Sequence, residues 1–339
     1  MGQLTDRAIY DAFAARDATP SALLGVRTTG VFCRPGCPAR LPRFENCEFF
    51  RSPEAALRAG YRACKRCHPT GEDFQLVRDV IALVEERGRV GEEELRAASI
   101  DPDTARRRFQ QKLGMSVAEY SRLRALGRAA QTRAQGGSVT DAQLDAGFAS
   151  PSGFRAAYAR TFGTAPREAA ADPLFIDWID TRFGPMVSVS DSHALYLVEF
   201  TDRVRLPRQF QRLRRMHGRA VVPGETTVSQ SMARQMDEYS SGTRRTFNVA
   251  LETAGTPFQG GVWAALQTIP YGETWSYAEL ARAVGNDKAV RAVASANGAN
   301  GLAIVIPCHR VIASDGGLGG YAGGVERKRQ LLELEAAHR

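Results

Sequence analysis

The sequence has no apolar run long enough to span a membrane, and its first residues, Met1–Asp6, contain no apolar core of a secretory signal. We therefore expect a cytoplasmic protein without a membrane partner. Cysteine is also scarce, with 6 in 339 residues. In a chain without a secretory signal, so few cysteines indicate metal binding or thiol chemistry rather than disulfide bonds.

Lysine contributes little to the positive charge, because arginine supplies nearly all of it. The net charge is +8 and the isoelectric point is near 9.4, which favours a polyanionic partner. Guanidinium groups bind phosphate in a fork that ammonium groups cannot form. With 43% hydrophobic and 24% charged residues the chain is otherwise typical of globular proteins, and its length predicts two or three domains.

The stretch Ile304–Val311, Ile-Val-Ile-Pro-Cys-His-Arg-Val, carries the clearest chemical signal. Its β-branched run predicts a buried strand that ends at Pro307. Cys308 and His309 follow at once, and a thiol becomes a good nucleophile when a nearby base takes its proton. From these residues alone two interpretations stay open: a catalytic pair, or a buried cysteine that only packs.

The flanks of this stretch resemble the O6-alkylguanine-DNA alkyltransferase family over about residues 172–339. The matching motifs are Phe258-Gln259, Ile269–Thr274, Lys288–Val293, Pro307–Val311 and Gly320–Gly324. The resemblance implies that the protein moves the alkyl group of O6-methylguanine, and of O4-methylthymine, irreversibly onto its own cysteine. Ala322 departs from relatives with serine at this point, so a preference for bulky alkyl groups is not implied.

The same resemblance implies roles for five residues near the cysteine. Cys308 matches the alkyl acceptor, His309 the water-linked base, and Glu335 the carboxylate that orients the histidine. Asn300 matches the residue that braces the active-site turn. Tyr277 matches the tyrosine that helps to rotate the nucleotide out of the duplex and to protonate the guanine.

The resemblance further implies that the segment Lys288–Asn297 is the recognition helix of a helix-turn-helix unit. Arg291 matches the arginine that fills the gap in the duplex, and Ala289 and Arg310 are further expected DNA contacts. Arg327-Lys328-Arg329 begins a terminal helix, where a solvated face and phosphate contact are equally open.

Four cysteines near the N-terminus form two close pairs, Cys33 with Cys37 and Cys64 with Cys67. Two such pairs, separated by a longer loop, are typical of a structural Zn²⁺ site with four thiolate ligands. The sequence therefore predicts one Zn²⁺. Cys47 has no partner at a suitable spacing, and we interpret it as a packing residue.

The segments Thr28–Arg40 and Ala59–Cys67 resemble the zinc domain of the bacterial adaptive-response (Ada) family over roughly residues 3–73. The resemblance implies that Cys33 accepts a methyl group from a methylphosphotriester in the DNA backbone. Methylation would remove one thiolate charge and so strengthen DNA binding, as a charge switch. The expected phosphate contacts are Thr29, Arg34, Arg40 and Arg66, with solvated surface charge as the alternative for each.

Residues 76–170 show helical periodicity interrupted by turns. Two helix-turn-helix units, joined by a long helix over residues 118–135, resemble the AraC-type DNA-binding domain. Their second helices carry arginines, Arg106, Arg107 and Arg108 in one and Arg155 and Arg160 in the other, and arginine on a helix can read guanine in the major groove. The alternative is a helical spacer without a role in DNA binding.

We thus expect a multidomain α/β protein. Residues 1–73 form a small zinc-binding α+β domain, and 75–168 an all-α double helix-turn-helix domain. Residues 174–254 form an α/β lobe, with strands at Trp178–Phe183, Met186–Val189 and Ala194–Phe200 and a basic helix from Arg203. Residues 255–339 form a helical, winged-helix-like alkyltransferase domain.

The expected partner is double-stranded DNA, both alkylated and promoter DNA, with RNA polymerase as a further partner of a monomeric, nucleoid-associated protein. The favoured function is DNA repair by methyl transfer, with the methylated protein activating transcription. Two alternatives remain. One is a zinc-containing transcription factor that lacks one or both transfer activities, and the other performs both repairs without regulation.

Overall fold

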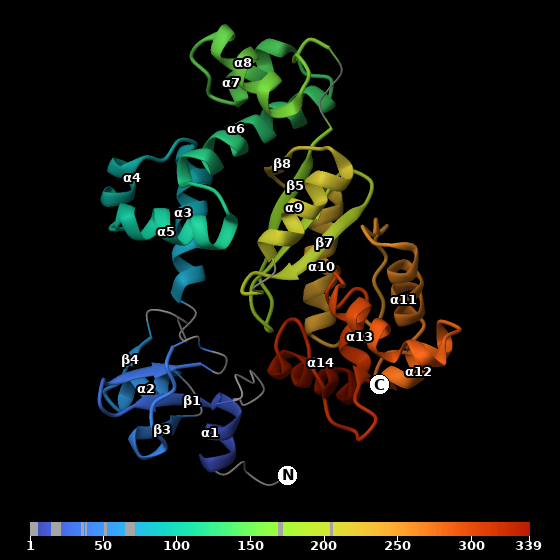
Figure 1. The fold of residues 1–339 in the computed structure, drawn as a ribbon. Coiled ribbons are helices and arrows are strands. Elements are labelled where there is room, and N and C mark those ends of the chain that lie inside the picture. The colour runs from blue at the N-terminus through green and yellow to red at the C-terminus, as the bar shows by residue number, and fades with distance from the viewer. Residues whose placement is uncertain are drawn as a thin grey trace.

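The computed structural model describes residues 6–14, 22–34, 37, 39–50, 53–64, 72–168, 172–203 and 206–339. A small sheet with short helices comes first, then a group of helices, then a second sheet and a final helical region (Figure 1). None of the described helices has both the length and the apolar character needed to cross a bilayer.

The N-terminal part is a four-stranded sheet with the order β3-β1-β2-β4. Its strands are β1 (Leu23–Val26), β2 (Val31–Cys33), β3 (Cys47–Phe50) and β4 (Arg62–Ala63); its helices are α1 (Asp6–Ala14), η1 (Phe44–Asn46) and α2 (Pro53–Arg58). Successive side chains of a strand point to opposite faces. Leu24 therefore joins the core beneath α1, whereas Leu23 joins the core beneath α2.

Strands β2 and β4 are parallel, with Val31 opposite Arg62 and Phe32 opposite Ala63. The next residue on each strand is a cysteine, Cys33 or Cys64. The backbone N–H of Cys64 donates to the carbonyl of Phe32 at 2.9 Å, which continues the ladder by one residue. The parallel pairing thus brings one member of each cysteine pair to the same end of the sheet.

Helices α3 to α8 form the next part: α3 (Glu72–Arg87), α4 (Glu92–Ala97), α5 (Pro102–Leu113), α6 (Val117–Ala134), α7 (Val139–Asp145) and α8 (Pro151–Phe162). Helices α5 and α8 are built alike. Asp101 and Ser150 cap their N-termini, a proline occupies the first turn of each, and both end at a left-handed glycine, Gly114 or Gly163. The chain therefore contains the expected helix pairs twice, on either side of α6.

A second four-stranded sheet has the order β7-β6-β5-β8. It contains β5 (Leu174–Ile179), β6 (Met186–Ser190), β7 (Leu195–Phe200) and β8 (Val221–Pro223), with helices α9 (Leu206–His217) and α10 (Thr227–Ser240). The strand predicted at Trp178–Phe183 lies four residues too late, because β5 ends at Ile179 and the chain then turns. The Thr181 hydroxyl donates to the carbonyl of Gly184 at 2.6 Å and closes that turn. Arg203 also precedes its predicted helix, in the turn after β7.

The C-terminal part contains α11 (Pro257–Gln267), β9 (Trp275–Ser276), α12 (Tyr277–Ala283), η2 (Asp287–Ala289), α13 (Val290–Gly298), η3 (Cys308–Arg310), β10 (Val311–Ile312) and α14 (Val325–Ala337). Its apolar core is continuous with that of the second sheet. Val198 and Phe200 of β7 and Met232 of α10 belong to the same buried cluster as Trp263 of α11 and Leu331 of α14. The two parts therefore share one core.

Helix α6 also packs against the second sheet. Leu123 forms a buried cluster with Phe175 of β5 and Val222 of β8. At Gly127 the contact is so close that an added Cβ would lie 2.6 Å from the carbonyl oxygen of Pro223. Helix α6 thus connects the two helix pairs and at the same time docks them on the sheet.

Replacing Gly127 with alanine tests this docking. Alanine normally stabilises a helix interior by about 1 kcal/mol relative to glycine, but here the Cβ contact with Pro223 adds strain of about 1–3 kcal/mol. We expect Gly127→Ala to lower the thermal unfolding midpoint. The matched control is Gly260→Ala in α11, where an added Cβ meets nothing within 4 Å and the midpoint should not fall. A Gly127→Ala protein as stable as the control would contradict the close packing.

Candidate active site and metal centre

Cys308 stands in a tight buried turn, and the predicted strand from Ile304 to Pro307 is wrong. Residues 301–303 instead lie beside β7, where the Val198 N–H donates to the carbonyl of Gly301 at 2.9 Å and the Ala303 N–H to that of Val198 at 2.8 Å. Ile304 then takes a positive φ of 71°, a costly conformation for a β-branched residue. The reversal at Ile304 points the following 3₁₀ turn, η3, back into the core.

Asn300 holds this turn closed. Its side-chain Nδ2 donates to the carbonyl of Ile306 at 2.9 Å and to the Sγ of Cys308 at 3.1 Å, while its Oδ1 accepts from the Leu302 N–H at 2.9 Å. The side chain is buried. In the structure Asn300 therefore closes the turn and contacts the sulfur directly, while its role in the reaction stays a prediction.

The sulfur of Cys308 faces a cavity of about 370 Å³. Cys308 is only 6% exposed, and burial raises the pKa of its thiol, whereas the Asn300 hydrogen bond and the charges of Arg203 and Lys328 lower it. The cavity is lined by Tyr277, Ala294, Asn297, Gly298, Ala303, Gly320, Tyr321, Ala322 and Gly323, among others. A cavity of this size accommodates one small planar group next to the thiol.

His309 and Glu335 form a buried pair behind the cysteine. Nε2 of His309 lies 2.9 Å from Oε1 of Glu335, and both side chains are fully buried. Burial lowers the pKa of His309 despite the nearby carboxylate, so the imidazole is neutral at neutral pH. Its other nitrogen, Nδ1, is buried and has no hydrogen-bond partner among the described residues. A neutral imidazole with one nitrogen held by a carboxylate can accept a proton at the other.

Glu335 receives five hydrogen bonds. Besides His309, the Tyr239 hydroxyl donates at 2.7 Å, the Gly272 N–H at 3.0 Å, and Arg310 at 2.9 Å and 3.0 Å. Burial alone would raise the pKa of this carboxyl, but the hydrogen bonds from His309 and Arg310 and the positive charge of Arg310 hold it well below its usual range. Glu335 is therefore ionised wherever the protein is folded near neutral pH.

The structure gives Arg310 a different place from the predicted DNA contact. Its side chain is buried, and it binds Glu335 and the carbonyl of Ile269 at 2.6 Å. The guanidinium balances the charge of the carboxylate in the interior instead of lying on the surface. Lys328 is likewise buried and donates to the carbonyls of Val311 and Leu318, so neither a solvated face nor phosphate contact describes it.

Of three further predicted residues, Tyr277 lines the cavity, whereas Arg291 and Ala289 lie at the start of α13. Tyr277, the first residue of α12, is half-buried, and burial, followed by the charge of Cys308, raises its pKa. Arg291 is exposed in the first turn of α13, and Ala289 precedes that helix as its N-cap residue. Because α13 begins at Val290 after η2, the predicted helix start at Lys288 is two residues early.

Sequence reasoning missed two charged residues at the cavity, Glu199 of β7 and Arg203 in the turn after it. Both are buried and form an ion pair with each other. They lie about a hundred positions before Cys308, and no motif joins them to it. The sequence contained one hint of their importance: Glu199 is a charged residue within the otherwise uncharged strand β7.

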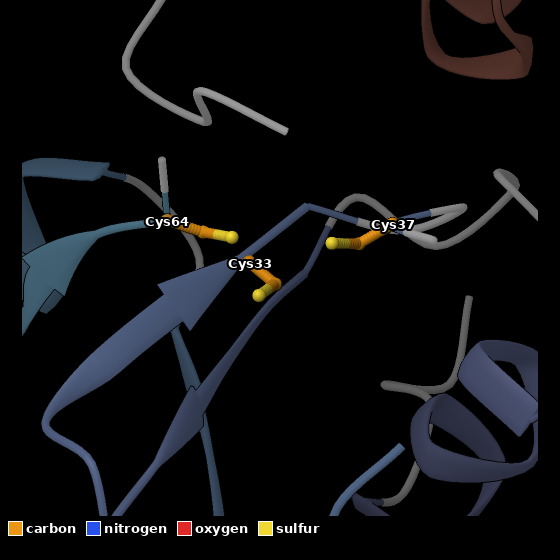
Figure 2. Close-up of side chains that lie close together, drawn as sticks. All are labelled: Cys33, Cys37 and Cys64. Atoms are coloured by element: carbon orange, nitrogen blue, oxygen red, sulfur yellow. The ribbon is translucent and has the colours of Figure 1, made fainter. Parts of the chain in front are cut away.

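The N-terminal cysteines converge at the end of β2. The Sγ atoms of Cys33, Cys37 and Cys64 all lie within 4.8 Å of one another, and Figure 2 shows them directed into a common space. Three thiols at this separation fit one Zn²⁺, whose bonds to sulfur are about 2.3 Å long. Cys67, the fourth predicted ligand, lies outside the described residues. Cys47 is buried elsewhere and donates to the carbonyl of Arg43 at 3.3 Å.

The predicted DNA-contact residues of the first two domains lie mostly on the surface. Thr29, Arg34 and Arg40 are exposed, and Arg66 lies outside the described residues. On the second helices of the helix pairs, Arg106, Arg107 and Arg155 are exposed, although Arg106 also pairs with Asp103. Arg108 differs, because it is buried and donates to Gln111 at 3.1 Å.

Comparison with known proteins gives three family matches along the chain. Residues 8–70 match the metal binding domain of Ada, residues 95–171 match a helix-turn-helix domain, and residues 257–337 match the DNA binding domain of 6-O-methylguanine DNA methyltransferase. The three matches define a multidomain alkyltransferase with attached zinc-binding and helix-turn-helix domains, as the predicted fold class states.

The chain is 36% identical to the bifunctional transcriptional activator/DNA repair enzyme Ada of Escherichia coli, over 98% of this chain and 97% of that protein. It is 35% identical to the regulatory protein ada of Salmonella typhimurium, over 95% of this chain and 94% of that protein. A crystal structure of Mycobacterium tuberculosis O6-methylguanine methyltransferase is 40% identical, with a TM-score of 0.43, and covers 49% of this chain and 94% of that one. The chain belongs to the Ada family.

Replacing Glu335 with glutamine removes the buried charge that balances Arg310. Loss of one partner of a buried ion pair typically costs about 3–5 kcal/mol, so Glu335→Gln should lower the free energy of unfolding by about this much at neutral pH. Glu333→Gln, at an exposed position of the same helix, is the control and should change little. Chemical denaturation measures both.

The pH dependence of this loss follows from the lowered pKa of Glu335. The unfolded chain binds a proton at this carboxyl near pH 4.3, whereas the folded protein does so only at lower pH. The stabilisation is therefore present above about pH 4.3 and is lost as the pH falls toward the folded pKa. The stability difference between wild type and Glu335→Gln should shrink in acid; a difference that grows in acid would contradict this assignment.

The metal site is tested by metal content rather than by activity. Elemental analysis should find about one Zn²⁺ per chain, the number that a four-thiolate site holds. Cys37→Ala should reduce the zinc content and the resistance of the zinc domain to a chelator. Cys47→Ala removes a buried cysteine outside the cluster and should retain the zinc. Equal zinc content in both variants would contradict the site.

Proposed function

We propose that this protein repairs alkylated DNA by transferring methyl groups irreversibly onto two of its own cysteines, Cys308 and Cys33, and that methylation turns it into a transcriptional activator. Membership of the Ada family makes it a DNA repair methyltransferase with a zinc domain and a helix-turn-helix domain. The observation that carries the assignment of Cys308 is the contact of its sulfur with Asn300, in a cavity backed by the His309–Glu335 pair.

The reaction at Cys308 begins with removal of the thiol proton. Neutral His309, oriented by Glu335 through Nε2, accepts this proton at Nδ1 by way of a water molecule, since its buried Nδ1 has no protein partner among the described residues. The thiolate attacks the methyl carbon of O6-methylguanine. A carbon–sulfur bond forms, the bond from carbon to O6 breaks, and the electron pair goes to the guanine.

The departing guanine anion takes a proton from the Tyr277 hydroxyl, and the proton that His309 accepted returns to the tyrosinate through solvent. Tyr277 lines the cavity that contains Cys308, and its backbone is fixed there as the first residue of α12. The same reaction, with a smaller base in the same cavity, would repair O4-methylthymine. Ala322 offers no hydroxyl to the substrate oxygen, so methyl groups are the expected substrates.

A base inside a duplex cannot enter a cavity, so the nucleotide must be flipped out. Arg291 is exposed at the start of α13, two residues after Ala289. A small residue beside an exposed arginine allows close approach of the helix to the duplex, with the arginine filling the gap. Arg291 is thus the proposed contact with DNA, whereas Arg310 binds the carboxylate of Glu335.

At Cys33 the substrate is a methylphosphotriester of the DNA backbone. The residues that would hold Zn²⁺ are Cys33, Cys37, Cys64 and Cys67, and the ion would keep the sulfur of Cys33 a thiolate at neutral pH. Thr29, Arg34, Arg40 and Arg66 would contact the neighbouring phosphates. Transfer of the methyl group converts an anionic thiolate to a neutral thioether, which removes repulsion between the site and DNA.

The transcriptional part of the proposal rests on the helix pairs. Helices α5 and α8 would enter successive major grooves of promoter DNA, with Arg106, Arg107 and Arg155 toward the bases. We assign residues 1–73 to phosphotriester repair and residues 75–168 to promoter binding. Residues 174–254 support the catalytic site, and residues 255–339 perform base repair. RNA polymerase is the proposed further partner of the methylated monomer.

Intact-protein mass after exposure to two DNAs tests the proposal. A duplex with O6-methylguanine should add one methyl group, mapped by peptide analysis to Cys308, and a duplex with methylphosphotriesters should add one at Cys33. Cys308→Ala should lose only the first addition and Cys33→Ala only the second, while Cys47→Ala, the control, keeps both. Retained transfer from O6-methylguanine in Cys308→Ala would refute the acceptor assignment.

The regulatory part has its own test. Binding to promoter DNA should strengthen after methylation of Cys33 and depend more weakly on methylation of Cys308. Since loss of one unit of repulsion acts through phosphate contacts, the gain should diminish as salt increases. Equal affinity of methylated and unmethylated protein would leave a repair protein without this switch.

A further inference from the structure

The α/β lobe contributes a buried charge pair to the wall of the active-site cavity. Glu199 is the fifth residue of β7 and Arg203 lies in the turn that follows, with exposures of 1% and 7%. The two side chains form an ion pair, and both line the cavity that contains Cys308. Burying two charges is costly unless they also make hydrogen bonds. The other hydrogen-bond partners of Glu199 and Arg203 therefore indicate the role of the pair.

Arg203 also donates hydrogen bonds to two backbone carbonyls of the C-terminal part, close to Cys308 in the chain. Nη1 donates to the carbonyl of Asn300 at 2.9 Å, and Nη2 to the carbonyl of Gly298 at 2.8 Å. Gly298 is the last residue of α13, so its carbonyl is one that the helix itself leaves without a donor. A cation at this end also complements the helix dipole.

These contacts connect the lobe to the nucleophile in two steps. Arg203 holds the backbone of Asn300, and the side chain of Asn300 in turn donates to the Sγ of Cys308 at 3.1 Å. The same guanidinium fixes the C-terminal end of α13, the helix that carries Arg291 at its other end. The planar fork of arginine suits two carbonyls and one carboxylate at once.

We propose that Arg203, anchored by Glu199, is a positioning residue for methyl transfer: it sets the Asn300 turn against Cys308 and supplies a buried positive charge toward the thiolate. The inference rests on the assignment of Cys308 as the acceptor. It also gives the α/β lobe a part in the reaction beyond support, since the lobe provides the cation and its anchor.

Charge and position make separate contributions, and two variants separate them. Arg203→Met keeps the volume but removes both the charge and the donors. Arg203→Lys keeps the charge but cannot reach both carbonyls and the carboxylate. The matched control is Arg219→Met, because Arg219 in the same lobe also pairs with a carboxylate, Asp191, and binds the carbonyls of Asp172 and Pro173.

The experiment uses the full chain and two readouts. One is the single-turnover rate of methyl transfer from an O6-methylguanine duplex, followed by mass at Cys308. The other is the pH dependence of Cys308 labelling by iodoacetamide, mapped by peptide, which reports the midpoint of thiol ionisation. A purely structural role would slow transfer only through loss of folded protein and would leave that midpoint unchanged.

For Arg203→Met we expect a loss of about tenfold or more in transfer rate, because misplacement of a nucleophile by a fraction of an ångström is sufficient for this. Its labelling midpoint should move to higher pH. Arg203→Lys should keep the wild-type midpoint yet transfer more slowly than wild type. Arg219→Met should match wild type in both readouts.

A transfer rate for Arg203→Met within about twofold of wild type, with an unchanged midpoint, would overturn the proposal. An equal loss in Arg219→Met would also overturn it, since the effect would then belong to the lobe as a whole. If Arg203→Met does not fold, Arg203→Lys decides by its rate. Wild-type protein that gains no methyl group at Cys308 would instead refute the acceptor assignment on which the inference rests.

Discussion

The buried carboxylate of Glu335 is the interaction on which the catalytic part depends. A charge without solvent is tolerable only where donors surround it, and here they come from three separate places in the chain: Tyr239 on α10, Gly272 before β9, and the neighbours His309 and Arg310 in η3. Each donor must therefore be in place for the others to be stable. The hydrogen bond with Glu335 fixes the orientation of the His309 ring. The ion pair with Glu335 likewise keeps Arg310 buried, with its guanidinium 5.6 Å from the centre of the Tyr271 ring.

In the proposed function, the two cysteine centres would reach a reactive thiolate by different physical means. Cys308 is buried, which disfavours the anion, and the protein opposes this with an amide hydrogen bond and two buried cations, Arg203 and Lys328. Cys33 lies at the edge of a small sheet beside Cys37 and Cys64, where a metal ion would provide the charge. A flipped base would require the first arrangement, because the base must be enclosed. A phosphotriester on the outside of a duplex would require the second, because the sulfur must remain near the surface.

Shared cores join the parts of the molecule that act on DNA. The α/β lobe and the helical catalytic part have one continuous core, and α6 docks the helix pairs on the same sheet through Leu123, Phe175 and Val222. The sheet thus stands between the helix pairs and the cavity that contains Cys308. Strand β7 shows how closely structure and chemistry are combined there, since Val198 pairs with the backbone next to the active-site turn while Glu199 anchors Arg203.

The sequence by itself determined the chemistry that local patterns encode. The paired cysteines, the Cys308-His309 motif and the caps of α5 and α8 depend on residues close together in the chain, and their spacing limits the possible structures. It did not determine what depends on distant partners. Ile304–Pro307 is apolar enough for a strand, yet pairing with β7 and the bond from Asn300 turn it into a reversal. Arg310 and Lys328 are of residue types usually found at a surface, and Lys328 lies in the charged run Arg327–Arg329, yet Glu335 holds Arg310 inside and two carbonyls hold Lys328 there. Glu199 and Arg203 carry no motif at all, because only the folded sheet brings them to Cys308. Burial of charge is a property of the assembled core, and the tertiary structure alone decided it.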